Sequence, residues 1–590
     1  MRSSNSKYVL MAASIIILAG VYACKKNFLD KPPVGSYGQS TLANSAGVQG
    51  LLIGAYSLLD GNGGAGGSWQ SAASNWVYGG VVSDDAHKGS DPGDQADILT
   101  LEQYKVNPSN SFLEAKWSWA YDGVQRANEA IRMMRLATNI KPSDTAEIVA
   151  EARFLRGHYH FEVKRMFNNI PYIDESVTYQ DKNFNIPNDK DIWPNIEADF
   201  QYAITNLPET QAQIGRANKY AAEAYLAKVY MYEHKYAEAK RLFDDVIANG
   251  KTSGGLPYAL VPKFHDNFDA ATKNNSETVF AAQMSVNDGS GAANANPGDV
   301  LNFPYNSKYP VACCGFYQPS FTLVNAFKTT TAGLPDVEHY NDVDVTNDYG
   351  LKDGDPFTPY TGNLDPRVDW TVGRRAIPFL DWGIMTGYSW IRNQSSGGPY
   401  LPIKDAPLKS QVGKFTDNTS WTAGYTAINY NIIRFADVLL MAAEAEVEIG
   451  SLDKAETYVN MVRNRAANPA GMVHTYIDPN DPTKGFTNKP AANYVINPYP
   501  TGYFASQGQA MARTLVQFER RLELAMEGHR FFDLVRYGIA DQVLNAYIAH
   551  EVKSGYNLLS TAHFTKGKNE YFPIPQQEID LSHGVLKQNQ

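Results

Sequence analysis

Apolar residues recur at helical spacing over long parts of the chain. Between residues 146 and 167 they follow one another at intervals of three or four, which places them on one side of a helix. The basic residues of this stretch fall mostly off the stripe and can stay in water. The spacing predicts a long amphipathic helix with a buried stripe formed by Ile148, Ala152, Leu155, Tyr159, Val163 and Met166.

Two further stretches predict pairs of antiparallel helices. Residues 222–250 combine Leu226, Ala227 and Tyr230 with Ala239 and Phe243, in the spacing of a tetratricopeptide repeat. The small alanine lets two helices approach closely, and the larger rings fill the groove beside it. A second unit spans residues 436–465, and a looser pair is predicted over residues 112–134 and 146–167.

In residues 251–430 the apolar positions follow neither the spacing of a helix nor the alternation of a strand. This stretch is rich in glycine, proline, asparagine and aromatic residues, as in "NFPYNSKYP" and "FLDWGIMTGYSW". So many rings argue against disorder. We therefore expect a mainly α protein, with a tetratricopeptide-like helical-pair scaffold and a large loop-rich insertion subdomain. The predicted regions are 24–250, 251–430 for the insertion, and 431–590.

The N-terminus predicts export and lipid attachment. Arg2 and Lys7 precede a short apolar run, which is too short to span a bilayer comfortably. Residues 1–23 therefore predict a secretory signal peptide. Cys24 follows in "VYAC", at the position of the acylated cysteine of a bacterial lipoprotein. The alternative is an ordinary signal peptide with an incidental cysteine.

The composition limits which classes of binding partner are expected. Removing residues 1–23 leaves 50 basic and 62 acidic residues, a net charge of −12, which argues against nucleic acid as the main partner. Tryptophan, tyrosine and phenylalanine total 71 residues (9, 36 and 26), more than the 52 lysines and arginines. A chain of this composition has a core rich in aromatic side chains or exposes aromatic rings that can bind a ligand. Cys313 and Cys314 are predicted to be two buried thiols, because side-chain geometry opposes a disulfide between neighbours.

The C-terminal part contains "ERRLELAMEGHRFFDLVRYG", residues 519–538. Its buried stripe is predicted at Leu515, Phe518, Leu522, Ala525 and Phe532. Arg520 with Glu523, and Glu527 with Arg530, have the spacing of local helical ion pairs. His529 and Asp533 could form a catalytic pair, but a structural pair is the favoured interpretation.

This string, together with "YFPIPQQEID", "FLDKPP" and "RFADVLLMAAEAEVEIG", resembles the SusD/RagB family over essentially the whole mature chain. The resemblance implies a tetratricopeptide-like scaffold in a surface-exposed outer-membrane lipoprotein, anchored at Cys24 and facing the cell exterior. It also implies a ligand site in the loop-rich half. The implied partner is a SusC-like TonB-dependent barrel, on which the protein sits as a lid.

Candidate ligand residues follow from the chemistry of sugars, whose C–H faces stack on aromatic rings while hydroxyls need short polar partners. Rings in Gly-, Asn- and Asp-rich loops, outside any periodic stripe, are the candidates. The segment 69–85 offers Trp69, Trp76, Tyr78, Asp84 and Asp85, and the insertion offers Tyr305, Tyr309, Trp382, Tyr388 and Trp390.

No cofactor is expected, although the acids of "SDDAHKGSDPGD" could instead hold a structural calcium ion. The sequence contains neither H-E-x-x-H nor G-x-S-x-G, so we expect no enzymatic activity. The main prediction is non-catalytic capture of a nutrient, a glycan or a peptide, for import. The alternatives are a scaffold that binds only proteins and an anchored glycoside hydrolase.

Overall fold

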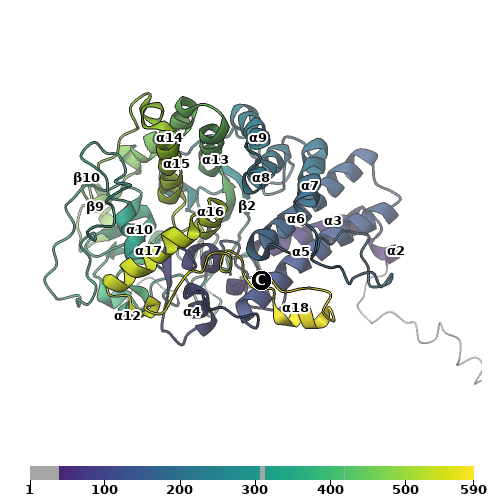
Figure 1. Cartoon of the computed structure of the whole chain (residues 1–590), viewed down its shortest axis with the longest axis horizontal. Coiled ribbons are helices and arrows are strands. Elements are labelled where there is room, and N and C mark those ends of the chain that lie inside the picture. Colours follow the sequence, from purple (N-terminus) through teal and green to yellow (C-terminus); the bar gives the residue numbers. More distant parts are fainter. Residues whose placement is uncertain (1–38, 306–312, 418, 590) are drawn as a thin grey trace, which may run out of the picture.

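The computed structural model describes residues 39–305, 313–417 and 419–589. The signal peptide, Cys24 and Tyr309 lie outside these ranges. The described chain is mainly helical, as predicted, with the long helices gathered on one side and the loop-rich segments on the other (Figure 1). None of the described helices is both long and apolar enough to cross a bilayer.

The predicted helical pairs are present. Helix α5 (Ser111–Leu136) packs on α6 (Pro142–Phe167), α8 (Lys219–Tyr232) on α9 (Tyr236–Asn249), and α13 (Phe435–Ile449) on α14 (Leu452–Ala466). Ala227, Ala239 and Phe243 are fully buried, as the repeat pattern requires. The other helices outside the insertion include α2 (Gln39–Leu42), α3 (Ser45–Tyr56), α7 (Trp193–Asn206), α15 (Tyr503–Leu524), α16 (Arg530–Arg536), α17 (Ala540–Lys553) and α18 (Gln576–Leu581).

The pairs join into one scaffold. Helix α7 connects α6 to α8, while α9 packs on α13 and α14 on α15. Side chains cap several helix starts: the Asn218 amide oxygen accepts from Ala221 N at 2.9 Å, and Ser451 Oγ accepts from Lys454 N at 3.3 Å. Such caps satisfy backbone N–H groups that have no partner within the helix.

The loop-rich insertion begins and ends on one pair of strands. β2 (Thr278–Ala282) lies antiparallel to β8 (Tyr430–Arg434), so about 150 residues leave the scaffold and return to it at the same place. The other elements of this half are short: β1 (Ala86–Gly89), α4 (Ala96–Glu102), β3 (Phe316–Pro319), α10 (Phe321–Ala326), α11 (Val368–Thr371), β4 (Val372–Gly373), β5 (Pro378–Phe379), β6 (Gly383–Ile384), α12 (Gln394–Gly397), β7 (Leu401–Pro402), β9 (His474–Tyr476) and β10 (Phe486–Pro490).

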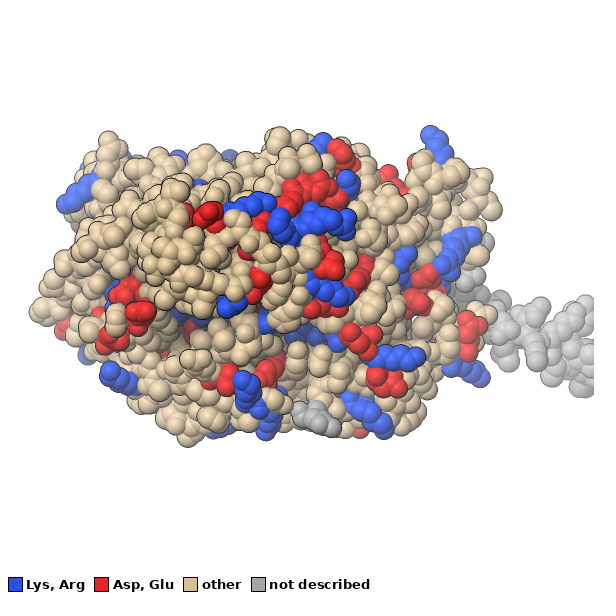
Figure 2. All heavy atoms as spheres, turned by 45° about the horizontal axis from the view of Figure 1, so that its top comes forward, with Lys and Arg blue, Asp and Glu red and all other residues tan. Residues whose placement is uncertain are grey.

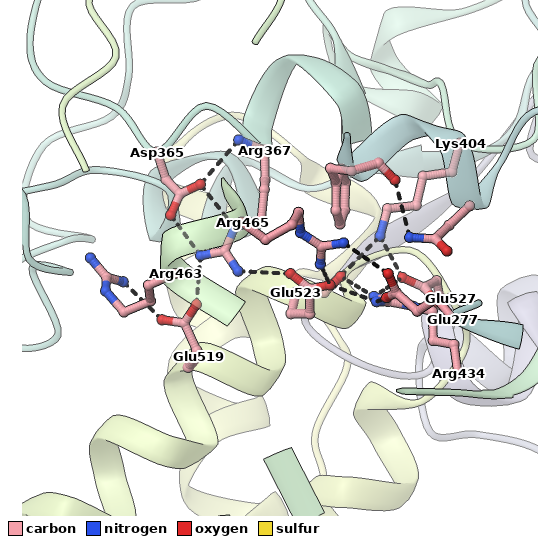
Figure 3. A network of polar contacts seen from close by, with 12 residues as sticks. Glu277, Asp365, Arg367, Lys404, Arg434, Arg463, Arg465, Glu519, Glu523 and Glu527 are labelled. Carbon is pink, nitrogen blue, oxygen red and sulfur yellow. Dashed lines mark hydrogen bonds and ion pairs between the residues drawn. The ribbon is translucent and has the colours of Figure 1, made fainter. Parts of the chain in front are cut away.

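A buried ionic network fastens the insertion to the helices (Figure 3). Glu523 on α15 forms ion pairs with Arg367 of the insertion at 2.9 Å and with Arg434 of β8 at 2.5 Å. Lys404, also of the insertion, reaches Glu527 at 2.6 Å. The cations are Arg367, Lys404, Arg434, Arg463 and Arg465, and the acids are Glu277, Asp365, Glu519, Glu523 and Glu527.

The structure corrects the predicted local pairs of the C-terminal string. Arg520 binds Asp437 and Asp533 rather than Glu523, and Arg530 binds Asp84 rather than Glu527. Each charge finds a buried partner from a distant segment, where an ion pair is screened less than on an exposed helix face. The predicted apolar stripe of this string is buried, as expected.

Surface charge is mixed. Figure 2 shows basic and acidic side chains interspersed on one face, largely surrounded by other residues. Lys454 contacts both Asp244 at 2.6 Å and Glu446 at 3.0 Å, which is an example of such alternation. On this face no broad basic surface suited to nucleic acid is visible.

Candidate functional site

The predicted ligand rings divide into buried and exposed groups. Tyr305 and Tyr388 are 45% and 49% exposed, and Trp69 is partly buried. Tyr309 lies outside the described ranges. The structure corrects the placement of the remaining ring and acid candidates, which are buried: Trp76, Tyr78, Asp84, Asp85, Trp382 and Trp390.

Trp76 and Tyr78 belong to the core because the turn that carries them is covered. They lie in the π-helical turn 76–81, where Trp76 Nε1 donates to Gly298 O at 3.1 Å and Tyr78 Oη donates to Phe112 O at 2.7 Å. A Cβ on Gly79 would lie 1.7 Å from the carbonyl oxygen of Gly528. The glycine that made this segment look like an open loop instead permits close backbone packing.

The two acids of this segment are structural. Asp84 binds Arg521 at 2.9 Å and Arg530 at 2.7 Å. Burial alone would raise the pKa of Asp84, but the two guanidiniums lower it to about 2. Burial and the Asp84 carboxylate raise the pKa of neighbouring Asp85 to about 6. These contacts tie the segment after the π-helical turn to α15 and α16.

Trp382 and Trp390 form part of a second, smaller core inside the insertion. Trp382 Nε1 donates to Pro407 O at 2.8 Å, and Trp390 packs against Phe379 with ring centroids 5.4 Å apart. This core gives the insertion apolar packing of its own. It also removes both indoles from solvent, so neither offers a face to a ligand.

The exposed Tyr305 lies over a fixed guanidinium. The Cζ atom of Arg392 is 4.7 Å from the centroid of the Tyr305 ring, the spacing of a cation–π contact. Arg392 is held in turn by Asp91 at 3.0 Å and Asp94 at 2.7 Å. We call these four residues, with Asn393, the Tyr305 site; Asn393 Nδ2 donates to Asp91 Oδ1 at 3.0 Å.

Backbone pairing holds the two loops of the Tyr305 site together. β1 lies antiparallel to β3, with Gly89 opposite Phe316. Ser90 N donates to Gly315 O at 2.5 Å. Gly315 has a φ of +78°, and a Cβ there would lie 3.1 Å from Arg392 Cβ, so a larger residue would crowd the guanidinium stem. The carboxylates and the ring are thus positioned by paired backbone rather than by free loops.

Tyr388 is held on the same insertion, four residues before Arg392 in sequence. Asp353 accepts from Ser389 N at 2.8 Å and from Thr386 Oγ1 at 2.9 Å, which fixes the turn on both sides of Tyr388. The exposed Tyr388 ring is therefore carried by a turn with few free conformations, which lowers the entropy lost when a ligand binds.

Trp421 is a further exposed ring that the sequence prediction missed. It is 61% exposed, and its Nε1 donates to Tyr425 Oη at 3.1 Å. Asp417 N donates to Tyr425 O at 2.8 Å and closes the turn that carries the ring. The composition of "TSWTAGY" has the same loop character that singled out the other candidates, so the same reasoning could have found it.

A buried histidine supports the strand before the Tyr305 site. His87 on β1 contacts Glu102 at 3.2 Å and Glu551 at 2.8 Å, and it stacks on Tyr556 with centroids 3.6 Å apart. Burial alone would lower the pKa of His87, but the two carboxylates raise it to about 9. No sequence signal indicated this cluster, because Glu551 lies 464 residues away.

Cys313 and Cys314 also border the site. A disulfide joins them, so the prediction of two buried thiols was wrong. Cys314 O accepts from Arg392 at 3.4 Å, which links this pair to the guanidinium.

The chemistry of the Tyr305 site is that of holding a ligand. Asp91 and Asp94 both bind the guanidinium of Arg392 and thereby hold it under the Tyr305 ring. Among the residues that the structure describes, no cluster of three or more His, Cys, Asp or Glu side chains could hold a metal ion. Three acids of the "SDDAHKGSDPGD" segment contact arginines: Asp84, Asp91 and Asp94.

Comparisons with known proteins agree over nearly the whole chain. A family model described as "SusD family" matches residues 276–590, slightly more than half of the chain. A second model, "Starch-binding associating with outer membrane", matches residues 68–231. The SusD-like protein P2 of Formosa agariphila is 23% identical over 588 residues, covering 98% of each chain.

Solved structures share the fold. A SusD superfamily protein from Bacteroides vulgatus superposes with a TM-score of 0.65 at 21% identity, covering 94% of this chain and 99% of the other. Surface glycan-binding protein A from Bacteroides thetaiotaomicron, solved in complex with laminarihexaose, gives a TM-score of 0.64 at 21% identity, covering 92% and 99%. At these identities the likeness establishes architecture and leaves the ligand open.

Proposed function

The chain belongs to the SusD family, and from that premise we propose that it captures an oligosaccharide without chemical change at the Tyr305 site. The observation that carries the proposal is the half-exposed Tyr305 ring lying over Arg392. The guanidinium occupies one side of the ring, which leaves the exposed side for the C–H face of a sugar. The laminarihexaose complex of a structural neighbour supports a glycan rather than a peptide.

The polar groups around the ring suit sugar hydroxyls. Asp91 and Asp94 have side chains that are 46% and 32% exposed, so their oxygens can accept from hydroxyl groups while they hold Arg392. Their existing hydrogen bonds fix the carboxylates before a ligand arrives, which lowers the cost of ordering them. Tyr388 supplies a second ring on the same insertion.

Cellular placement completes the proposal. The description of the family model over residues 68–231 supports association with the outer membrane. We propose that a lipid on Cys24 provides the attachment and that the protein faces the cell exterior. We also propose that it delivers its ligand to a SusC-like TonB-dependent barrel, since capture without chemistry requires a route for import.

The test uses the mature chain from residue 24 with Cys24→Ser, which removes the acylation site. A glycan array that includes laminarihexaose identifies the best ligand, and titration calorimetry gives its Kd for wild type and Tyr305→Ala. Losing a stacking ring costs more than about 1 kcal/mol, and a central one about 2, so we expect a roughly five- to thirty-fold weaker Kd. Tyr571→Ala, an exposed tyrosine near the C-terminus, is the matched control and should leave the Kd unchanged.

Two results would contradict the proposal. An unchanged Kd for both Tyr305→Ala and Tyr388→Ala would place the ligand elsewhere. Breakdown of the ligand during long incubation with wild type, detected by chromatography of the products, would overturn the non-catalytic assignment.

A further inference from the structure

A large hollow lies away from the Tyr305 site. A groove of about 850 Å³ runs between α5, α18 and the segment 171–186, and we call it the α5–α18 groove. Figure 1 shows α18 well apart from α12, beside which the Tyr305 site lies. The proposed glycan function makes no use of this groove.

The walls of the groove expose apolar side chains. Tyr179 and Phe184 form a tilted ring pair with centroids 5.1 Å apart on one side, and Leu136 and Leu581 face the hollow from α5 and α18. All four are among the exposed large apolar residues, with Tyr179 79% and Leu581 65% exposed. Apolar side chains gathered on a surface in this way mark a binding or docking site.

One end of the groove is acidic. Glu578 of α18 lines it, and Glu114 in the first turn of α5 lies against Glu578. Burial, the Glu578 carboxylate and a side-chain hydrogen bond with Glu578 raise the pKa of Glu114 to about 7. A cation placed here would offset the repulsion between the two carboxyl groups.

We infer that residues 25–38 of this chain, the segment between the proposed lipid anchor and α2, dock in the α5–α18 groove. The described chain starts at Gln39 in α2, which packs on α3, and α3 packs on α5, the wall of the groove. Fourteen extended residues span roughly 46 Å, enough to travel along one neighbouring helix pair. The segment therefore begins close to the groove and is long enough to fill it.

The composition of the segment matches the groove. Residues 25–38 carry three lysines and one aspartate, a net charge of +2, against the acidic end at Glu114 and Glu578. Phe28 and Leu29 supply apolar side chains for the walls, and two prolines at positions 32 and 33 favour an extended chain that loses little entropy on docking.

Docking would fix the orientation of the protein. A free tether of this length lets the body rotate at the membrane surface, whereas a docked one holds the lipid-bearing residue beside α18. The α18 end of the molecule would then face the membrane, and the Tyr305 site would face away from it.

Photo-crosslinking tests the contact in the full mature chain. Phe28→benzoylphenylalanine is introduced together with Cys24→Ser, the purified protein is irradiated, and the joined peptides are mapped by mass spectrometry. We expect an intramolecular link to α5, near Met133, or to α18. Leu581→Asp should lower its yield at least fivefold, while Ile449→Asp, an exposed apolar residue at the end of α13, should leave it unchanged.

A second variant and a second readout guard against misfolding. Leu136→Asp disturbs the opposite wall, and the rate of tryptic cleavage after Lys26 reports release of the segment. We expect cleavage to accelerate at least fivefold in Leu136→Asp relative to wild type, at equal melting temperature. The inference is overturned by links that map outside the groove, by links between two molecules, by no link at all, or by variants that match wild type in both readouts.

Discussion

Replacing Glu523 by glutamine removes one charge from a network in which five buried cations face five buried acids (Figure 3). Glu523 Oε1 accepts from Arg434 at 2.5 Å and also from Arg465, while Oε2 accepts from Arg367 at 2.9 Å. Both oxygens are therefore occupied by guanidinium donors. A glutamine amide has one NH2 group, so at least one guanidinium would face a donor instead of an acceptor.

The expected cost follows from this geometry. Removing one partner of a buried ion pair leaves an uncompensated charge and typically costs about 3–5 kcal/mol. Against a total stability of about 5–15 kcal/mol, that is a large loss. Because Arg367 belongs to the insertion and Glu523 to α15, we also expect the insertion to detach at lower denaturant than the helices.

Urea unfolding measures the effect. Circular dichroism monitors the helices, and tryptophan fluorescence monitors the insertion core around Trp382 and Trp390. Glu448→Gln is the matched control, because its partner Arg513 is 38% exposed and such pairs contribute only about 0–1 kcal/mol. We expect Glu523→Gln to shift the midpoint strongly and Glu448→Gln to leave it near wild type.

Acidification gives an independent check on the same residue. Burial alone would raise the pKa of Glu523, but Arg465, Arg434 and Arg367 lower it well below its ordinary value of 4.5. The stability that Glu523 contributes is thus fully present above about pH 4.5 and is lost as the pH falls toward the folded pKa. Glu523→Gln should lack this component. A variant that unfolds like wild type at pH 7 and shows the same acid dependence would refute the reasoning.

Three further predictions follow from the fold. Trp76→Ala should cost about 3–5 kcal/mol of stability and leave ligand affinity unchanged in the folded fraction. Weaker binding at an unchanged melting temperature would instead indicate that Trp76 contacts the ligand. His87 has a raised pKa of about 9, so its contribution, on the order of 3 kcal/mol, is present below pH 6.5 and lost as the pH rises through 9. Urea midpoints at pH 6 and pH 9 should therefore differ less for His87→Asn than for wild type, and equal differences would contradict this. Cys24→Ala should abolish both membrane fractionation and incorporation of radiolabelled lipid, and an unchanged membrane fraction would count against the anchor.

The sequence was most informative where structure depends on near neighbours. The spacing from Ile148 to Met166 predicted a helix over residues 146–167, and α6 spans Pro142–Phe167 with that stripe buried. The alanines of the repeat pattern likewise indicated where two helices touch. Helical periodicity is a local property, because residues three and four apart share a face whatever the rest of the chain does.

The sequence also limited the kind of site, without locating it. An abundance of rings in glycine- and asparagine-rich segments indicated that some would be exposed, and Tyr305, Tyr388 and Trp421 are. Composition alone could not separate these from Trp76 and Trp390. All five lie in similar sequence surroundings, and nothing local distinguishes a ring that another segment covers from one that water covers.

Only the tertiary structure decided which rings and charges were left for a ligand. Trp76 is buried because residues more than 200 positions away, at Gly298 and Phe316, fold over it. Arg392 becomes the support of Tyr305 because Asp91 and Asp94, some 300 positions earlier, meet it across the β1–β3 pair. Burial and charge pairing are sums over everything that surrounds a side chain, and most of those neighbours are fixed by how distant segments pack rather than by the residues next to it in sequence.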